Sequence, residues 1–453
     1  MVTNPDQSAG LVARFIYRLR KASQSLLGRG SAAILDQALF AGTNFLLNIL
    51  LIRWMGNEDQ YGAFATGFAV FLLVSAVHQS FLIEPMMIYG AGEYGERFSR
   101  YLVHVLKLHI LLTAVLSVVA GIFALILMAM ASSILAWTAL GLSLLIPFLL
   151  FMWMMRRTFY VTGDIYWSAM GGGIYFGTNV SLTFLLSKLN ALSAFSAFAT
   201  MGIGAFLTGL FLLYLQKPIL NISENDLDLR EIVQKHWHYG RWVAPSTALK
   251  WIPDQIYYTL LPLVVGLGGS AALRAILNLV MPISNVNAAL TMVLIPKFVR
   301  TLHDQGQEKM ERLMKMGILF FGVISSCYII VLLLFGRPIV SFIYDGNYVE
   351  YLDAPVILLL GIMPFFSGMT SVIGGALRAR EWVNLVWWAT VVATILTLTL
   401  GLILLATGGL LGALGGLLAS SVAMAFTSLW LYYHPHAADR LQGLFKRKVS
   451  SSE

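Results

Sequence analysis

The sequence predicts an all-α membrane protein that crosses the bilayer many times, and three observations support this prediction. Hydrophobic residues make up 58% of the chain, charged residues make up 11%, and the mean hydropathy is +0.77. Charge is therefore too scarce to cover the surface of a water-soluble protein of 453 residues. The apolar residues also gather in long runs, without the alternating apolar and polar decamers that indicate a membrane barrel.

The apolar runs give the number of helices. A helix that crosses the bilayer needs about 20 mostly apolar residues, and the chain contains about twelve such runs joined by short connections. They lie at residues 31–53, 61–89, 104–130, 132–155, 164–187, 191–215, 241–265, 271–295, 313–335, 353–375, 382–406 and 410–433. We therefore expect about 12 transmembrane helices.

Lysine and arginine residues give the orientation. With the N-terminus in the cytoplasm, 25 of these thirty residues lie on the inside, four lie outside, and Lys250 lies within a span. This asymmetry predicts that both termini face the cytoplasm. The net charge of +8 then reflects topology and contact with lipid headgroups, and it requires no nucleic-acid partner.

The chain also shows signs of an internal duplication. Pro85 lies 29 residues after Gly56, Pro296 lies 30 residues after Gly266, and each proline ends an even-numbered span. A six-span repeat keeps its orientation, so we expect two six-helix lobes related by a pseudo-two-fold axis along the membrane normal. The predicted parts are a cytoplasmic amphipathic segment (1–30), an N-lobe (31–215), a cytoplasmic linker (216–240), a C-lobe (241–433) and a cytoplasmic basic tail (434–453).

Two long stretches resemble a known family of transporters. "SAALRAILNLVMPISNVNAALTMVLIPKFVR", in which Pro282 and Pro296 are 14 residues apart, resembles the eighth span of the multidrug/oligosaccharidyl-lipid/polysaccharide (MOP) exporter superfamily. "DQALFAGTNFLLNILLIRWMGNEDQYGAFATGFAVFLLVSA" is similar to the first two spans of the bacterial polysaccharide-unit flippases in that superfamily. The resemblance extends from about Ser31 to Tyr433 and rests on diffuse patterns and the number of spans.

This resemblance implies a function. It implies a flippase, not an enzyme, that moves an undecaprenyl-diphosphate-linked oligosaccharide across the bacterial inner membrane for surface or exopolysaccharide assembly. The two lobes would face a central cavity and work by alternating access, possible coupling ions being H⁺ and Na⁺. No cofactor is implied, and the possible protein partners are a polysaccharide polymerase and a chain-length regulator.

The stretch "APSTALKWIPDQIYYTLLPL", residues 244–263, places two charges inside the seventh span. A charge at mid-bilayer costs about 2.5–3.5 kcal/mol, whereas an exposed pair one turn apart returns only about 0.2–0.5 kcal/mol. In one interpretation Lys250 and Asp254 neutralise each other inside the bundle. In the other they face a wet cavity, where Lys250 meets the substrate diphosphate and Asp254 holds Lys250 or a coupling cation. Pro253 and Pro262 favour the second, because they loosen the helix.

Other polar residues inside the spans extend this candidate site. The substrate-binding candidates beside Lys250 are Arg274, Asn44, Asn48 and Asn278, and the ion-coupling or gating candidates beside Asp254 are Glu84 and Asp36. Each also has a structural interpretation: interhelical hydrogen bonds of roughly 0.6 kcal/mol for the asparagines, an interfacial position for Arg274, and pairing with loop arginines for the acids. His78 is interpreted as a core histidine, the alternative being a proton relay.

Three alternative functions remain open. An ion-coupled multidrug exporter of the same superfamily would be expected to hold an acid near the middle of span one, where this chain has Thr43 and Asn44. A peptidoglycan-lipid flippase of this superfamily typically has fourteen spans, whereas this chain has about twelve apolar runs. A membrane glycosyltransferase or polymerase would need catalytic residues on a large outer loop, but the longest, "GRPIVSFIYDGNYVEYLD", holds no such cluster. We assign no metal site, because "HPH" at 434–436 offers only two histidines.

Overall fold

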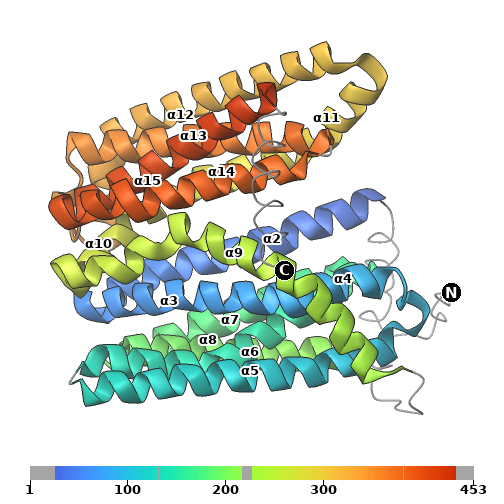
Figure 1. Cartoon of the computed structure of the whole chain (residues 1–453). Coiled ribbons are helices and arrows are strands. Elements are labelled where there is room, and N and C mark those ends of the chain that lie inside the picture. Colours follow the sequence, from blue (N-terminus) through green and yellow to red (C-terminus); the bar gives the residue numbers. More distant parts are fainter. Residues whose placement is uncertain (1–25, 131, 217–226, 381, 435–453) are drawn as a thin grey trace, which may run out of the picture. The chain divides into compact units, whose positions relative to one another are not determined.

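The computed structural model describes residues 26–130, 132–216, 227–380 and 382–434 (Figure 1). All the regular elements in these ranges are helices, so the predicted all-α fold class is confirmed. The chain divides into two compact units, Met1–Thr247 and Ala248–Glu453. The predicted amphipathic segment and basic tail fall almost wholly outside the described residues.

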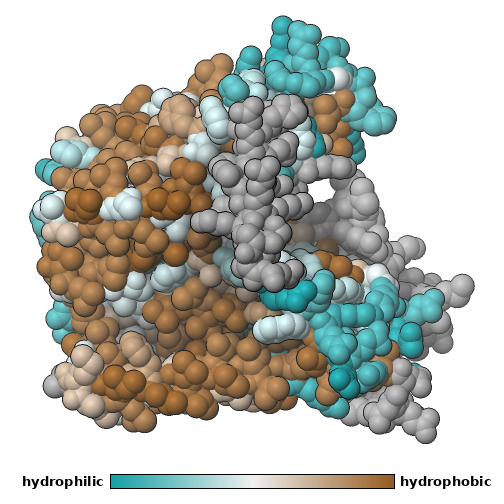
Figure 2. Space-filling view, in the orientation of Figure 1, coloured by the Kyte–Doolittle hydropathy of each residue, from teal (hydrophilic) through white to brown (hydrophobic). Residues whose placement is uncertain are grey.

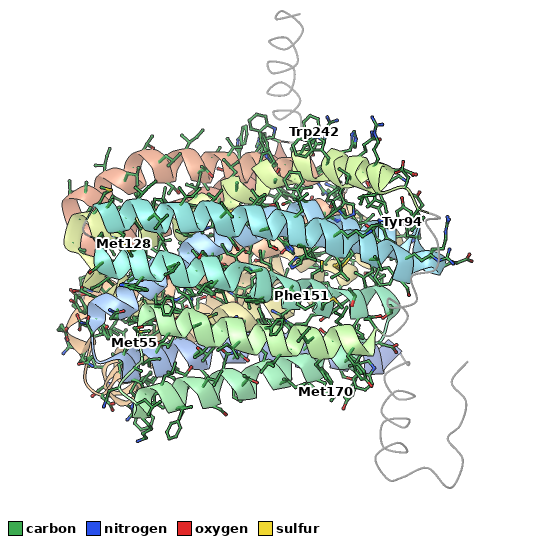
Figure 3. All side chains as sticks on the ribbon, turned by 90° about the horizontal axis from the view of Figure 1, so that it is seen from below. Met55, Tyr94, Met128, Phe151, Met170 and Trp242 are labelled. Carbon is green, nitrogen blue, oxygen red and sulfur yellow. The ribbon has the colours of Figure 1, made fainter. Side chains whose placement is uncertain are left out.

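The first unit contains the helices of the first six predicted spans. They are α2 (Leu26–Met55), α3 (Glu58–His78) with its continuation through the π-helix η1 (Gln79–Ile83) into α4 (Glu84–Ala91), η2 (Gly95–Arg97), α5 (Phe98–Ala129), α6 (Ser133–Thr162), α7 (Ile165–Lys188) and α8 (Ala194–Leu215). The first part of α9 (Leu229–Val265) also belongs to this unit. Figure 3 shows Tyr94 toward one end of these helices and Met55 and Met128 toward the other.

The second unit contains the rest of α9 and the helices of the last five predicted spans. They are α10 (Leu267–Asn278), α11 (Met281–Gln305), α12 (Gln307–Tyr344), η4 (Val349–Tyr351), α13 (Ala354–Ala379), α14 (Val383–Leu396), η5 (Thr397–Gly401) and α15 (Leu402–Tyr433). Inside α15, Gly409 has φ 53° and ψ −123°, a conformation that favours glycine. A Cβ at Gly412 would lie 1.8 Å from the carbonyl oxygen of Leu404, so the chain turns sharply here.

The twelve predicted spans each match a helix or a bent pair of helices. In the described residues, eight helical segments are long and apolar enough to cross a membrane, and α10 with α11 forms a ninth that is bent by 48°. The segment 384–433 contains the last two predicted spans, which meet at Gly409. Helices α7 and α9, which match two further predicted spans, are not among these nine.

The same pattern of packing recurs in the two units. In the first unit α6 packs against α3, α5 and α8, and in the second unit α13 packs against α11, α12 and α15. Numbered by span, both central helices are the fourth of their half, and each contacts the second, third and sixth. This repeated pattern supports the predicted duplication.

The exposed surface of the helices is apolar. Figure 2 shows hydrophobic residues over most of the visible helix surface and hydrophilic residues at the turn between α11 and α12. In α5 and α12, the third spans of their halves, only 11% and 17% of the most apolar window is buried. Such surfaces need lipid around them, so the chain is a multi-pass membrane protein.

Helix α9 begins earlier than the sequence predicts. Residues 229–240 fall in the predicted cytoplasmic linker, but they form the first turns of a continuous helix that ends at Val265. The boundary between the two units falls inside this helix, after Thr247. One helix therefore has its first half in one unit and its second half in the other.

Candidate functional site

Lys250 and Asp254 lie on the side of α9 that packs within the second unit. Residues 250, 254, 257 and 261 share one face of an α-helix. On this face Tyr257 is 1% exposed and Leu261 is fully buried. Leu263, which is nine residues or about two and a half turns after Asp254, lies on the opposite face and is 81% exposed.

Both charged side chains are nevertheless exposed. No ion pair within 4.0 Å joins Lys250 to Asp254 or to another acid in the described part of the chain. Pro253 between them is buried, and α9 continues through it. Both charges are therefore exposed on the face of α9 on which Tyr257 and Leu261 are buried.

Arg274 and Asn278 lie one turn apart on α10, and both are buried. The guanidinium carbon of Arg274 lies 5.5 Å from the centroid of the Tyr258 ring on α9, which is a cation–π contact. Tyr258 is one turn after Asp254, so Arg274 lies against the same helix as the charged pair. Asn278 instead faces α12, where its Nδ2 donates to Tyr344 OH at 3.5 Å.

Tyrosine hydroxyls from α12 donate to backbone carbonyls beside the bend between α10 and α11. Tyr344 OH donates to Ala275 O at 3.1 Å, and Tyr328 OH donates to Leu279 O. A broken helix within a membrane is tolerated only where such groups are satisfied by protein or water. These tyrosines therefore stabilise the segment that carries Arg274.

Asn48 connects two helices of the first unit. Its Oδ1 accepts a hydrogen bond from Tyr61 OH on α3 at 3.1 Å, and its Nδ2 donates to Asn44 O at 2.7 Å. Asn48 is 4% exposed, whereas Asn44 is partly exposed. The structure therefore places these two asparagines together and gives Asn48 a packing contact.

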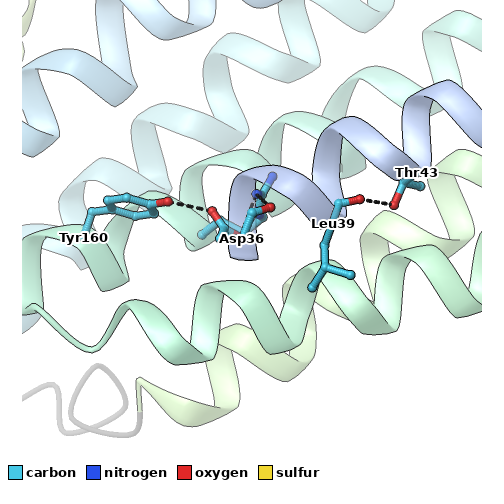
Figure 4. Close-up of polar contacts among 5 residues, drawn as sticks. Asp36, Leu39, Thr43 and Tyr160 are labelled. Carbon is cyan, nitrogen blue, oxygen red and sulfur yellow. Dashed lines mark hydrogen bonds and ion pairs between the residues drawn. The ribbon is translucent and has the colours of Figure 1, made fainter. Parts of the chain in front are cut away.

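Asp36 is held by a buried ion pair (Figure 4). Its Oδ1 accepts from Arg156 Nη2 at 2.7 Å and from Nε at 3.2 Å, and its Oδ2 accepts from Tyr160 OH at 2.7 Å. The guanidinium of Arg156 also lies 4.3 Å from the centroid of the Phe40 ring. These contacts join α2 to the C-terminal part of α6.

Glu84 begins α4 and is partly exposed. Its Oε1 accepts from Gln79 Nε2 at 3.3 Å, and its Oε2 accepts from Tyr239 OH at 3.1 Å. Tyr239 lies in the first half of α9. Glu84 therefore helps to bind α9 to the first unit, and the structure does not bring it together with Asp36.

His236 makes the central contact between α9 and the first unit. Its Nδ1 donates to the carbonyl oxygen of Phe81 at 2.8 Å, and its Nε2 lies 2.6 Å from Tyr101 OH. Because a carbonyl can only accept, Nδ1 carries the hydrogen, and the neutral ring accepts from Tyr101 at Nε2. The residue four positions after Phe81 is Pro85, which has no N–H for the usual helical hydrogen bond.

Neighbouring residues of α9 strengthen this attachment. Trp237 stacks on Phe81 with ring centroids 5.4 Å apart, and a Cβ at Gly240 would lie 2.2 Å from the same ring. Lys235 forms ion pairs with Glu93 and Glu231. These partners, with hydrogen bonding to Glu231 the largest cause, raise the pKa of Lys235 above its usual range. We call residues 235–240 the α9 anchor.

Sequence reasoning missed the α9 anchor because it lies in a polar connection. One signal was present, since Pro85 inside a span frees a carbonyl that needs another donor. The donor itself lies 155 residues away in sequence, so no local pattern could identify it.

The α9 anchor gives a testable pH dependence. His236 precedes the predicted span, and burial lowers its pKa below the usual 6.5, although the hydrogen bond to Phe81 O opposes this shift. The folded state then binds fewer protons than the unfolded state, so the contribution of His236 to stability is complete above pH 6.5 and decreases as the pH falls below it. We expect the melting temperature of the wild type to fall more between about pH 7.5 and pH 5 than that of His236→Phe.

The replacement should also destabilise the protein at neutral pH by about 1–3 kcal/mol, because Phe81 O loses its donor. His303, exposed on α11, provides the matched control His303→Phe, which should leave the pH dependence unchanged. Equal acid sensitivity in the wild type and His236→Phe would contradict the assigned role of His236.

No protein-family model matches the chain, and no curated protein matches its sequence. Solved structures do match. One match is a multidrug resistance MATE family transporter of the MOP superfamily in an inward-facing conformation. It is 15% identical in sequence, with a TM-score of 0.73, and the match covers 89% of this chain and 95% of the transporter's chain. Another match is the lipid II flippase MurJ in an inward closed conformation. It is 15% identical in sequence, with a TM-score of 0.70, and the match covers 90% of this chain and 87% of the MurJ chain.

A third match is a MOP superfamily transporter from Pyrococcus furiosus, whose description suggests a different function from the reversed polarity of its binding pocket. It is 15% identical with a TM-score of 0.62 and covers 93% of this chain and 97% of its own. The chain therefore has the fold of the MOP superfamily transporters, as the sequence resemblance implied. The named proteins of this fold are transporters and a flippase.

Proposed function

We propose that this protein is a flippase for an undecaprenyl-diphosphate-linked oligosaccharide. The observation that carries the proposal is the exposed Lys250 on the protein side of α9, which pairs with none of the described acids, with Arg274 against the same helix. A cationic group within a span has a free-energy cost, and binding of an anionic substrate would offset this cost. A diphosphate carries several acceptor oxygens that ammonium and guanidinium groups bind strongly.

A lipid-linked substrate also fits the comparison with MurJ, which is described as a lipid II flippase. A flippase of a lipid therefore occurs with this fold. In our proposal Asn44 adds sugar or phosphate contacts, and Asn48 positions Asn44. Asn278, which is buried and donates to Tyr344 OH, positions the segment of α10 that carries Arg274.

We propose that α9 transmits the movement in alternating access. The α9 anchor binds its first half to the first unit, and Tyr257 and Leu261 bind its second half within the second unit. Any movement of one unit against the other must therefore bend α9 between Gly240 and Tyr257. This segment contains Pro245, Pro253 and the two charges, so bending would move Lys250. Asp254, Glu84 and Asp36 are the proposed coupling or gating acids, with H⁺ or Na⁺ as the ion.

The proposed location is the bacterial inner membrane with both termini in the cytoplasm, where a polysaccharide polymerase and a chain-length regulator would act on the product. Single cysteines at Ser223 and Asn347, in a Cys327→Ala background, test the orientation. An impermeant thiol reagent added to intact cells should label position 347 and leave position 223 unlabelled. Labelling of position 223 from outside would reverse the orientation.

Reconstitution tests the function directly. The purified protein in vesicles should move a fluorescent polyprenyl-diphosphate oligosaccharide between leaflets, as measured by an impermeant quencher. A neutral glycolipid with the same polyprenyl chain and sugars should not move, because it lacks the diphosphate. Transport of a cationic drug without movement of the diphosphate lipid would instead assign the protein to the alternative of a multidrug exporter.

A further inference from the structure

A pair of histidines lies inside the first unit, away from the candidate site. His78 Nε2 on α3 and His109 Nδ1 on α5 are 2.9 Å apart, and the two residues are 0% and 4% exposed. His109 follows the start of α5 by 11 residues, and His78 precedes the end of α4 by 13 residues. Both therefore lie roughly 16–20 Å from those helix ends, deep within the spans.

The contacts of the pair leave one ring nitrogen without a partner. One hydrogen is shared between His78 Nε2 and His109 Nδ1, so one of these atoms donates and the other accepts. The other nitrogen of His78, Nδ1, is buried and has no hydrogen-bond partner. A buried N–H without an acceptor is rarer than a buried acceptor without a donor. We therefore assign Nδ1 as bare, with His78 Nε2–H donating to His109 Nδ1.

Few other ionisable groups lie on the elements around this pair. Among the described residues no third metal ligand joins the two histidines, and neither ring forms an ion pair. The nearest ionisable residues along η1, α4, α5 and α6 are Glu84, His104, Lys107 and Arg156. Glu84 is bonded to Tyr239 and Gln79, Arg156 is paired with Asp36, Lys107 is exposed, and His104 is partly buried.

We propose that His78 Nδ1 is the site at which this protein binds its coupling proton, with His109 as the positioning residue. The bare nitrogen is the one position in the pair that can accept a proton without breaking the hydrogen bond between the rings. The imidazolium formed at His78 keeps donating from Nε2 to His109. This proposal specifies the coupling ion of the proposed flippase and rests on that function for its role in transport. It assigns coupling to His78 and leaves Asp254, Glu84 and Asp36 as gating acids.

The structure also supplies a connection from this site to α9. A protonated Nδ1 is a buried donor without an acceptor, so its surroundings must move or admit water. The residue after His78 begins the π-helix η1, whose hydrogen bonds span one residue more than those of an α-helix. Phe81, whose carbonyl binds His236 of the α9 anchor, lies within η1. A shift of η1 on protonation would therefore act on the attachment of α9.

Solid-state NMR of the full-length protein, labelled with ¹⁵N-histidine and embedded in lipid bilayers, tests the proton site without requiring transport. The Nδ1 signal of His78, identified by its loss in His78→Gln, should be that of a bare nitrogen at high pH and of an N–H nitrogen at low pH. His303→Gln, which removes an exposed histidine, should leave this change intact. If His78 Nδ1 stays bare, or carries hydrogen throughout the range of stability, the proposal is wrong.

A second measurement connects the site to coupling. Vesicles with the wild-type protein should move the diphosphate lipid faster under an imposed pH gradient than without one. His78→Gln can still donate to His109 but cannot take up a proton, so it should retain movement at equal pH and lose the acceleration. Acceleration that persists in His78→Gln would overturn the coupling role. Absence of any movement in the wild type would contradict the proposed function and leave the NMR result to decide the proton site.

Discussion

The double replacement Lys250→Leu with Asp254→Leu is expected to give a stable, membrane-inserted protein that no longer moves the diphosphate lipid. Removing both charges from the span lowers the cost of insertion, so folding should not suffer. Loss of a hydrogen bond to a charged phosphate costs about 1.5–3 kcal/mol, which corresponds to roughly a 10- to 100-fold lower rate of movement. The measurement is lipid movement per unit of folded protein in vesicles.

Exchange of the two charges separates the proposed site from simple neutralisation. Lys250→Asp with Asp254→Lys keeps the net charge but moves the cation by about one turn, roughly 5–6 Å. If Lys250 binds the diphosphate, the exchanged protein should lose most of its lipid movement. If the two charges only neutralise each other, lipid movement should be retained. Lys188→Ala, at the end of α7, is the matched control and should be fully active. Wild-type movement by the double leucine variant would show that these charges have only a packing role.

Asp36→Ala is expected to destabilise the protein more than either His236→Phe or Tyr160→Phe. It leaves the guanidinium of Arg156 buried without its carboxylate, and breaking such a pair costs about 3–5 kcal/mol. Tyr160→Phe removes only one hydrogen bond to the carboxylate and should cost about 1.5–3 kcal/mol. Thermal unfolding of the purified variants measures these effects.

The double variant Asp36→Leu with Arg156→Met tests whether Asp36 does more than pack. Replacing both members of a buried pair by apolar residues is often neutral for stability, so this variant should recover most of the lost melting temperature. A coupling role for Asp36 would appear as a folded variant whose transport no longer responds to the ion gradient. Full transport in this variant would leave Asp36 with a structural role only.

Much of the fold could be predicted because a membrane span is long and must be apolar. Each of the twelve apolar runs matches a helix or a bent pair, including the two short-connected runs that meet at Gly409. The start of α9 was missed because residues 229–240 contain charges and histidines, and a helix that packs on protein needs no long apolar run. The tyrosines that donate to carbonyls beside the bend between α10 and α11 come from α12 and are distant in sequence.

The candidate site was predictable only in part. Charges inside a span are conspicuous, so Lys250 and Asp254 could be selected, whereas the absence of an ion pair between them required coordinates. Asp36 was selected too, but its partner Arg156 lies 120 residues away. His109 was overlooked because nothing in its own helix signals a second histidine opposite it. Long-range pairs of this kind leave no local pattern.

The attachment of α9 to the first unit has a consequence for biosynthesis. A ribosome that has just completed α8 has produced six spans, but residues 235–240, which bind Phe81, Glu84 and Glu93, have not yet been made. The carbonyl of Phe81 and the hydroxyl of Tyr101 then lack their hydrogen bonds to His236. Because chains are made from the N-terminus, the first half must wait for the opening helix of the second half before its own structure is finished. A nascent chain arrested after residue 215 is therefore expected to be incompletely folded and to be degraded by cellular quality control.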